Sequence, residues 1–188
     1  MNENLAKIRH ERSVKDFPTL GLDDDEYVEF AFKRAKIYLV LMYSGLILGL
    51  ALVAIALSIA TSKTSMLGPM GQNFINIILM ILIVAALIAA GFIWMIYHGN
   101  KVFITNKRVI QKVRLSPFAT STNMVDLSSI EDVSYRQGGI LQTLFHYGTF
   151  RLATVGDETT YTFPYAEVSA DDLKVISRMI SDAKDNKD

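Results

Sequence analysis

The sequence predicts a protein of two parts: an α-helical membrane hairpin of two transmembrane helices, and a small α+β domain. In that domain a small antiparallel β-barrel or bent sheet is closed by a C-terminal capping helix. Two long uncharged apolar segments predict the helices, and later short segments rich in β-branched and aromatic residues predict the sheet. With 188 residues, the chain has room for an anchor and one ordinary domain.

The apolar segments cover residues 37–60 and 74–97, and neither contains a charged side chain. At roughly 1.5 Å per residue, 24 residues extend about 36 Å, which exceeds a hydrocarbon core of about 30 Å. Two buried helices of a soluble protein are a poor alternative, because the rest of the chain could not cover both. A cleaved signal peptide is also disfavoured, because the first apolar run is too long and follows 36 residues of charged sequence.

Five segments follow from these spans. They are a cytoplasmic N-terminal segment (1–36), a first span (37–60), an external turn (61–73), a second span (74–97) and a cytoplasmic domain (98–188). The orientation comes from the basic residues near the span ends, since cytoplasmic flanks carry the excess of lysine and arginine. Seven bases on the flanks, against one in the connecting turn, predict a multi-pass protein of the inner membrane with both termini cytoplasmic. The flanking bases are Lys33, Arg34, Lys36, Lys101, Lys107, Arg108 and Lys112, and the turn has Lys63.

Small residues on both spans predict helix–helix packing. Gly45 and Gly49 form a GxxxG step on the first span, and the second span has small residues at Ala85, Ala86, Ala89 and Ala90. Helices in lipid associate where small residues let their backbones approach closely. Packing within the hairpin is the favoured interpretation, and homo-oligomerisation through the same faces is the alternative. Because neither span contains Asp, Glu, Lys, Arg or His, a transporter or channel is only a distant third hypothesis.

The N-terminal segment contains four consecutive acids, Asp23 to Glu26, followed by YVEFAFKRAK. Acids before a basic stretch suit the start of a helix, so this segment is predicted to run as a helix into the first span. Consecutive acids on a helix point in different directions, which favours a capping or solvated role over a metal site. The first fifteen residues are predicted to be flexible or weakly helical.

From residue 100 onward the pattern changes to short β-type segments separated by turn signals. These segments are KVFIT, RVIQKVR, NMVDL, IEDVSYR, GTFRLATV and TTYTFPY. In the fifth, Phe150 and Leu152 are expected on one face and Arg151 on the other. A C-terminal helix is predicted from Ser169 as N-cap with Asp172 as its capping-box partner. Its apolar stripe consists of Leu173, Ile176, Met179, Ile180 and Ala183.

Three further motifs carry a family resemblance. They are Thr105-Asn106 with Arg108-Val109-Ile110, then Ile130 with Asp132-Val133, and Leu144-Phe145 with Tyr147-Gly148-Thr149. Together they resemble bacterial membrane proteins in which two spans precede a PH-like domain. On physical grounds, Asn106 tolerates a left-handed backbone, so Thr-Asn-Lys suits a tight hairpin, and Gly148 is expected to serve a bulge or turn. Phe145 and Tyr147 are expected to pack under the sheet.

No pattern of catalytic, metal or cofactor chemistry is found in the sequence. The chain has no cysteine, and the histidines at 10, 98 and 146 lack ligand spacing. Gly138-Gly139 is not followed by the lysine and helix of a phosphate loop. The 19 basic and 19 acidic residues balance, which argues against nucleic acid as a partner. We therefore expect a non-enzymatic protein without cofactor or metal.

One basic cluster is a candidate binding site: Lys101, Lys107, Arg108, Lys112 and Arg114, with no acid between Asn100 and Arg114. The resemblance implies contact with lipid head groups, because bases around the first hairpin of eukaryotic PH domains bind phosphorylated lipids. Bases in this position are also what membrane topology alone requires. Two functions follow as hypotheses: a membrane-anchored scaffold that contacts anionic lipid, and a platform for a membrane-protein partner or self-assembly.

Overall fold

The computed structural model describes residues 3–63, 68–154 and 160–185, and the chain divides into two compact units. One unit combines Met1–Ala35 with His98–Asp188, and the other is Lys36–Tyr97. The predicted domain start at residue 98 agrees with this division, but the prediction left out the N-terminal segment, which belongs to the same unit. We call the first unit the β domain and the second the hairpin.

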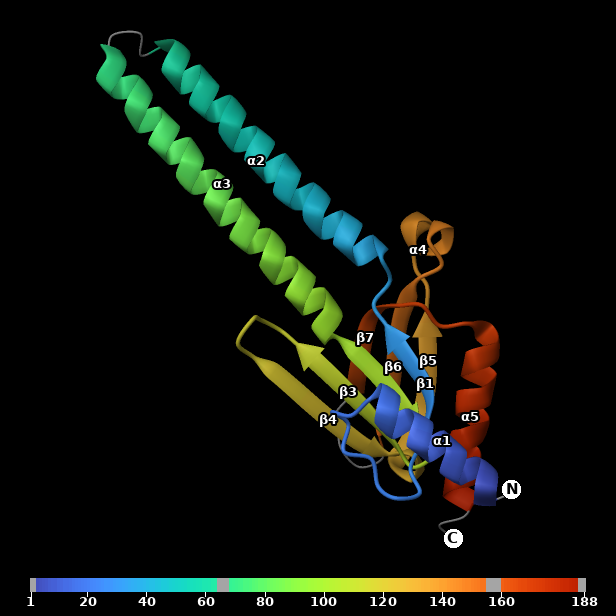
Figure 1. Ribbon diagram of the computed structural model, residues 1–188. Coiled ribbons are helices and arrows are strands. Elements are labelled where there is room, and N and C mark those ends of the chain that lie inside the picture. Colours follow the sequence, from blue (N-terminus) through green and yellow to red (C-terminus); the bar gives the residue numbers. More distant parts are fainter. Residues whose placement is uncertain (1–2, 64–67, 155–159, 186–188) are drawn as a thin grey trace. The chain divides into compact units, whose positions relative to one another are not determined.

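The β domain has two antiparallel sheets with the strand orders β1-β2-β3-β4 and β5-β6-β7 (Figure 1). The elements of the first sheet and its flank are α1 (Glu3–Asp16), β1 (Val28–Lys33), β2 (Lys101–Thr105), β3 (Arg108–Arg114) and β4 (Thr120–Asp126). Those of the second are η2 (Leu127–Ser129), β5 (Ile130–Arg136), α4 (Ile140–Leu144), β6 (Gly148–Thr154), β7 (Thr160–Ala166) and α5 (Ala170–Asp185). An isolated bridge between Arg34 and Ala166 joins the two sheets at one edge.

The core lies between the sheets and under α5, where Ile130, Phe150 and Ile176 are almost fully buried. The six predicted β-segments match β2 to β7, and the predicted alternation on β6 is confirmed by buried Phe150 and Leu152 flanking exposed Arg151. The predicted cap of α5 is also confirmed. The Ser169 N–H donates to Asp172 Oδ2 at 3.1 Å, and the Asp171 N–H donates to Ser169 Oγ at 3.2 Å.

β1 was not predicted: residues 28–33 form a strand where the sequence predicted a helix leading into the first span. The physical reason is the period of two in VEFAFK, which places Phe30 and Phe32 on one face. A bulge between Val28 and Phe30 turns Val28 to the opposite face, where it packs with Phe103 and Ile110. Phe32 lies 6.0 Å from Phe150 of the opposite sheet, measured between ring centroids. Because β1 pairs with β2, the hairpin is an insertion between two neighbouring strands of one sheet.

The start of the segment before β1 was predicted to be flexible or weakly helical, and it forms a helix. Residues 3–16 form the helix α1, which is attached to β1 by two polar contacts. The Val28 N–H donates to Ser13 Oγ at 3.0 Å, and Arg9 forms an ion pair with Glu29 at 2.7 Å. These contacts hold the N-terminal helix against the sheet.

The hairpin consists of α2 (Ile37–Lys63) and α3 (Gly68–Gly99). The helices extend into the predicted turn 61–73, whose residues 64–67 lie outside the described part of the chain. The Tyr43 hydroxyl donates to the Ala90 carbonyl at 3.2 Å, and the rings of Tyr38 and Tyr97 stack with centroids 6.4 Å apart. These two contacts connect the first half of α2 with the last half of α3.

The predicted GxxxG packing within the hairpin is not found. A Cβ built on Gly45 or Gly49 meets no heavy atom within 4 Å among the described residues, so neither glycine lies at the helix–helix contact. On α2 the half-buried positions include Leu46 and Leu50 instead, each rotated by about 100° from the preceding glycine. On α3, Ala86, Ala89 and Ala90 are half-buried, whereas Ala85 is exposed.

Candidate functional site

The β2–β3 hairpin carries the five predicted basic residues but separates them into two groups. Lys101 pairs with Lys112 across the open end of the hairpin, and Arg114 follows on the same strand. Lys107 and Arg108 lie at the turn, the full length of β2 away, which is about 17 Å at 3.3 Å per residue. One ligand of ordinary size therefore cannot contact all five.

Arg108 is held by Glu26 and is not available as a lipid contact. Its Nε and Nη2 donate to the two carboxylate oxygens of Glu26 at 2.9 and 2.7 Å, a bidentate pair. Glu26 is fully buried, and the Arg108 side chain is 21% exposed. The predicted lipid contact at Arg108 is thus replaced by a structural role.

The surroundings of Glu26 explain how a charge is tolerated there. The Thr105 hydroxyl donates to Oε1 at 2.7 Å and the Asp23 N–H donates to Oε2 at 3.1 Å. Burial raises the pKa of Glu26, but the hydrogen bonds from Arg108, Thr105 and Asp23 outweigh it, so the pKa lies below its ordinary value. In turn, the hydrogen bond to Glu26 raises the pKa of Arg108. Sequence reasoning assigned Glu26 to a solvated acidic run and missed this role.

The β2–β3 turn is confirmed as a tight hairpin, but Asn106 acts through its side chain and not through a left-handed backbone. Among the described residues other than glycine, positive φ angles occur only at His146 and Tyr165. Asn106 Oδ1 accepts the Tyr27 N–H at 3.0 Å, and Asn106 Nδ2 donates to the Asp25 carbonyl at 3.0 Å. The turn is therefore bonded to the segment that precedes β1, and Lys107 is left exposed beside it.

The other three bases share a pocket of about 300 Å³, which we call the basic pocket. Its lining comes from the end of α1 and the segment after it, the last residues of α3, and strands β2, β3 and β4: Asp16, Phe17, Pro18, Thr19, His98, Gly99, Lys101, Phe103, Lys112, Arg114 and Thr120. Lys101, Lys112 and Arg114 outnumber its one carboxylate, Asp16. The pocket is therefore suited to an anionic group.

Contacts within the basic pocket fix two of its three bases. Lys112 Nζ donates to the carbonyl and hydroxyl of Thr19 at 2.9 and 3.0 Å, and Arg114 Nε donates to Thr120 Oγ1 at 3.2 Å. Burial and the charge of Lys101 both lower the pKa of Lys112. Arg114 also packs on Gly99, where a Cβ would lie 2.8 Å from Arg114 Cδ, so this position requires glycine.

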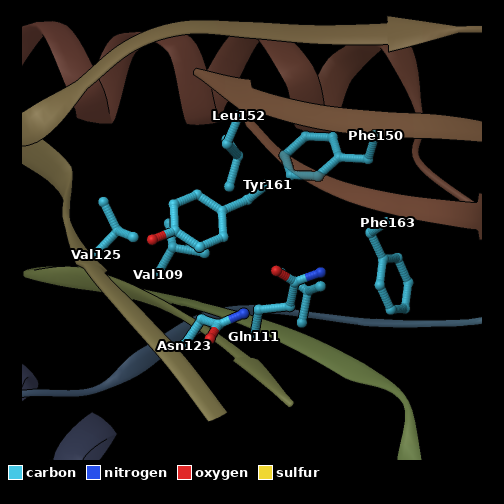
Figure 2. A pocket seen from close by; sticks show the side chains of 9 residues that line it. Val109, Gln111, Asn123, Val125, Phe150, Leu152, Tyr161 and Phe163 are labelled. Atoms are coloured by element: carbon cyan, nitrogen blue, oxygen red, sulfur yellow. The ribbon is translucent and has the colours of Figure 1, made fainter. Parts of the chain in front are cut away.

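A second hollow lies between the two sheets and is too small for a ligand. Its volume is about 10 Å³, at the limit for one water molecule. Figure 2 shows Gln111 and Asn123 from one sheet facing Tyr161 and Phe163 from the other. The Gln111 amide donates to the Thr162 carbonyl at 3.1 Å, so this polar side chain ties the sheets together.

The motif around β6 is partly as predicted. Gly148 lies at a register shift of β6 against β7, and a Cβ there would lie 2.7 Å from the Arg136 carbonyl oxygen. Tyr147 is buried as predicted, but Phe145 is 47% exposed, so the prediction for Phe145 is wrong. Among the described residues no group of three or more His, Asp or Glu could hold a metal ion.

Two bent antiparallel sheets with a helix along one open side define a PH-like α+β module. The chain belongs to the bacterial PH domain family, whose family model matches residues 37–184. That match covers both hairpin helices and β2 to β7, and it leaves out β1. It confirms the predicted family resemblance and α+β fold.

Among solved structures, the chain is similar to the crystal structure of a DUF1696 family protein with a pleckstrin-homology domain from Shewanella loihica PV-4. The two share 9% sequence identity with a TM-score of 0.40, over 93% of this chain and 96% of that chain. A comparison with curated protein sequences finds no match.

Proposed function

We propose that the protein is a non-catalytic binding module, anchored by its hairpin in the inner membrane, whose basic pocket contacts anionic lipid head groups on the cytoplasmic side. The observation that carries this proposal is the insertion of the hairpin between β1 and β2. Lys33 of β1 pairs with Lys101 of β2, so both connections to the hairpin leave the β domain at the pocket end.

The anchor is supported by the two helices, whose segments Ile37–Ala60 and Asn73–Gly99 are long and apolar enough to cross a bilayer. None of the residues in their most apolar windows is buried, and large side chains such as Leu48 and Leu87 are exposed. A continuous apolar surface of this length requires a lipid environment or a partner. The excess of bases on the flanks supports a cytoplasmic β domain.

The pocket lies close to the span by chain length alone. Lys101 follows Tyr97 by four residues, so the two Cα atoms are within about 14 Å of each other. Each base near an anionic leaflet contributes about 1 kcal/mol, and tethering raises the effective lipid concentration that the pocket meets. Weak head-group affinity is therefore sufficient for occupancy.

The test uses the full chain in nanodiscs of zwitterionic lipid with a minor fraction of phosphatidylglycerol. Native mass spectrometry of the released protein measures which lipid it retains. We expect the wild type to enrich the anionic lipid and the triple variant K101Q/K112Q/R114Q to lose the enrichment. K107Q is the matched control, since it removes an exposed base at the other end of the same strands. Equal enrichment by wild type and triple variant would refute the lipid contact.

Orientation is tested separately, because the cysteine-free chain accepts single labels. A membrane-impermeant maleimide should label K63C from outside intact cells. It should label L5C, on α1, only after lysis. The reverse pattern would place the β domain outside.

A second candidate function is self-assembly in the membrane, favoured by the open faces of Gly45 and Gly49 on α2. Small residues that face away from the hairpin could seat a second copy closely. In that case G45L/G49L should lower energy transfer between labelled copies in liposomes, while G91L, at another uncrowded glycine, should not. Unchanged transfer in G45L/G49L would exclude this interface.

A further inference from the structure

The β3–β4 loop exposes two large apolar side chains at its tip. Phe118 is 94% exposed and Leu115 is 76% exposed, the largest exposures of the hydrophobic residues in this strand pair. The loop begins directly after Arg114, a base of the basic pocket. Two hydrogen bonds close the loop: the Leu115 N–H donates to the Ala119 carbonyl at 3.2 Å, and the Ala119 N–H donates to Ser116 Oγ at 3.1 Å.

The short helix α4 is a second apolar protrusion. Ile140 is 87% exposed, and Leu144, Leu141 and Phe145 are exposed beside it. The helix is held by the Gly138 N–H, which donates to Gln142 Oε1, and by the Tyr147 N–H, which donates to the Gln142 carbonyl at 3.1 Å. None of the residues of α4 is buried, so its apolar side chains project outward from the β domain.

Strand register places both protrusions at the same end of the β domain. Lys112 pairs with Lys101, so the β3–β4 loop extends past the start of β2. On the second sheet, Gly148 pairs with Ala166, which bridges Arg34 at the end of β1, and α4 lies just before Gly148. The loop and α4 therefore both extend from the end at which β1 and β2 connect to the hairpin helices (Figure 1).

The charged residues also differ between the two ends of the β domain. The end with the protrusions carries Lys33, Lys101, Lys112 and Arg114, against the acids Asp16, Glu167 and Asp172. The opposite end, at the β2–β3 turn, presents the exposed acids 23–25, one of which accepts a hydrogen bond from Asn106 through its carbonyl. An anionic leaflet attracts the first end and repels the second.

We infer that the β3–β4 loop and α4 insert into the interfacial layer of the leaflet that the hairpin crosses. Apolar side chains flanked by bases are the composition of interfacial membrane contacts. A lipid surface is favoured over a protein partner because the chain itself holds this end within a few residues of the span. The inference rests on the proposed membrane anchor, but it does not require the pocket to select anionic lipid.

The test places an environment-sensitive fluorophore on single cysteines in the otherwise cysteine-free full chain, reconstituted in liposomes. The labelled variants are F118C and I140C, and K107C at the acidic end is the matched control. All three sites are exposed, so labelling leaves the core intact. Trp94, the single tryptophan of the chain, lies on α3 and reports on the hairpin through quenching by brominated lipids.

We expect doxyl lipids to quench the labels at 118 and 140 several-fold more strongly than the label at 107, with emission shifted to shorter wavelength. Quenching of Trp94 without quenching at 118 and 140 would overturn the inference and leave the membrane anchor standing. Unquenched Trp94 would refute the anchor, and the inference with it. If insertion is independent of lipid charge, the labels at 118 and 140 remain quenched in purely zwitterionic liposomes.

Discussion

At the scale of single residues, the bidentate pair of Glu26 and Arg108 connects the segment before β1 to the turn after β2. Residues 26 and 108 are far apart in sequence, and the whole hairpin lies between them. Arg108 Nη2 also donates to the Gly21 carbonyl at 3.1 Å, so one guanidinium ties two points of the N-terminal segment. The pair therefore bonds the part of the β domain that precedes the hairpin to the part that follows it.

Replacing Glu26 by glutamine should destabilise the β domain by about 3 kcal/mol, because it breaks a buried ion pair while leaving the arginine in place. The measurement is urea unfolding of the detergent-solubilised chain, followed by near-UV circular dichroism. D24N is the matched control, since Asp24 is an exposed acid two residues away, and its midpoint should stay close to wild type. A similar midpoint for E26Q would contradict the structural role of the pair.

The lowered pKa of Glu26 should also make the stability of the β domain depend on pH. Since the pKa of Glu26 is lower in the folded than in the unfolded state, its contribution is complete above the ordinary value of 4.5. It is lost as the pH falls from there through the folded pKa. The difference in unfolding free energy between wild type and E26Q should therefore be constant near neutral pH and shrink below about pH 4.5. A difference that grows on acidification would have the wrong sign.

At the scale of elements, the sequence allowed β2 to β7, the capped helix α5 and the two apolar helices to be predicted. Each has a local period or a cap that identifies it without tertiary information. β1 has the same alternating pattern, but its position between an acidic run and an apolar span favoured a helical interpretation. The pairing of β1 with β2 crosses the entire hairpin, and no local pattern encodes such a long-range contact.

The candidate site was predictable only in part, for a related reason. Composition identified the five bases around the β2–β3 hairpin, and strand length alone could have divided them into two groups. What the sequence could not show is that Glu26 is buried and bonded to Arg108, or that Thr19 contacts Lys112. Both partners, Glu26 and Thr19, come from the N-terminal segment. This segment is far from β3 in sequence, so only the folded structure shows that they are in contact.

A fragment of residues 98–188 alone should fail to fold, because it lacks β1 and the apolar side chains of the N-terminal segment. Leu20 packs with Phe103 and Ile110, and Phe32 packs in the main core. Without them, the outer edge of β2 and a large apolar surface are exposed. We expect poor dispersion of amide signals in NMR spectra of this fragment, and native-like dispersion when residues 1–35 are joined to it by a short linker. A well-dispersed spectrum of 98–188 alone would contradict the observed domain composition.

At the scale of the whole molecule, the hairpin can be regarded as a long insertion into the connection between two adjacent strands. Since Lys33 and Lys101 are partners in the register, a short Gly-rich turn can replace residues 36–97 without moving either strand. The resulting soluble β domain separates the contribution of the basic pocket from that of the anchor.

This hairpin-deleted domain should bind anionic liposomes weakly and in a salt-dependent manner. Substituting Lys101, Lys112 and Arg114 by glutamine removes about 3 kcal/mol, which is a roughly 100-fold loss of partitioning. K107Q should cost much less, because, with the pocket end on the lipid as proposed, Lys107 would lie farther from the lipid surface than the screening length of about 8–10 Å. Co-sedimentation measures both, and equal losses for the triple variant and K107Q would indicate diffuse attraction without a defined site.

The insertion of the hairpin between β1 and β2 also couples biogenesis to folding. If the helices cross the bilayer as proposed, sheet formation requires an even number of crossings. A chain in which one helix fails to insert leaves β1 and β2 on opposite sides of the membrane. Its β2 then keeps an unpaired edge, and Glu26 and Arg108 are separated. Completion of the β domain would thus act as a checkpoint for correct insertion, and misinserted chains would remain open to quality-control proteases.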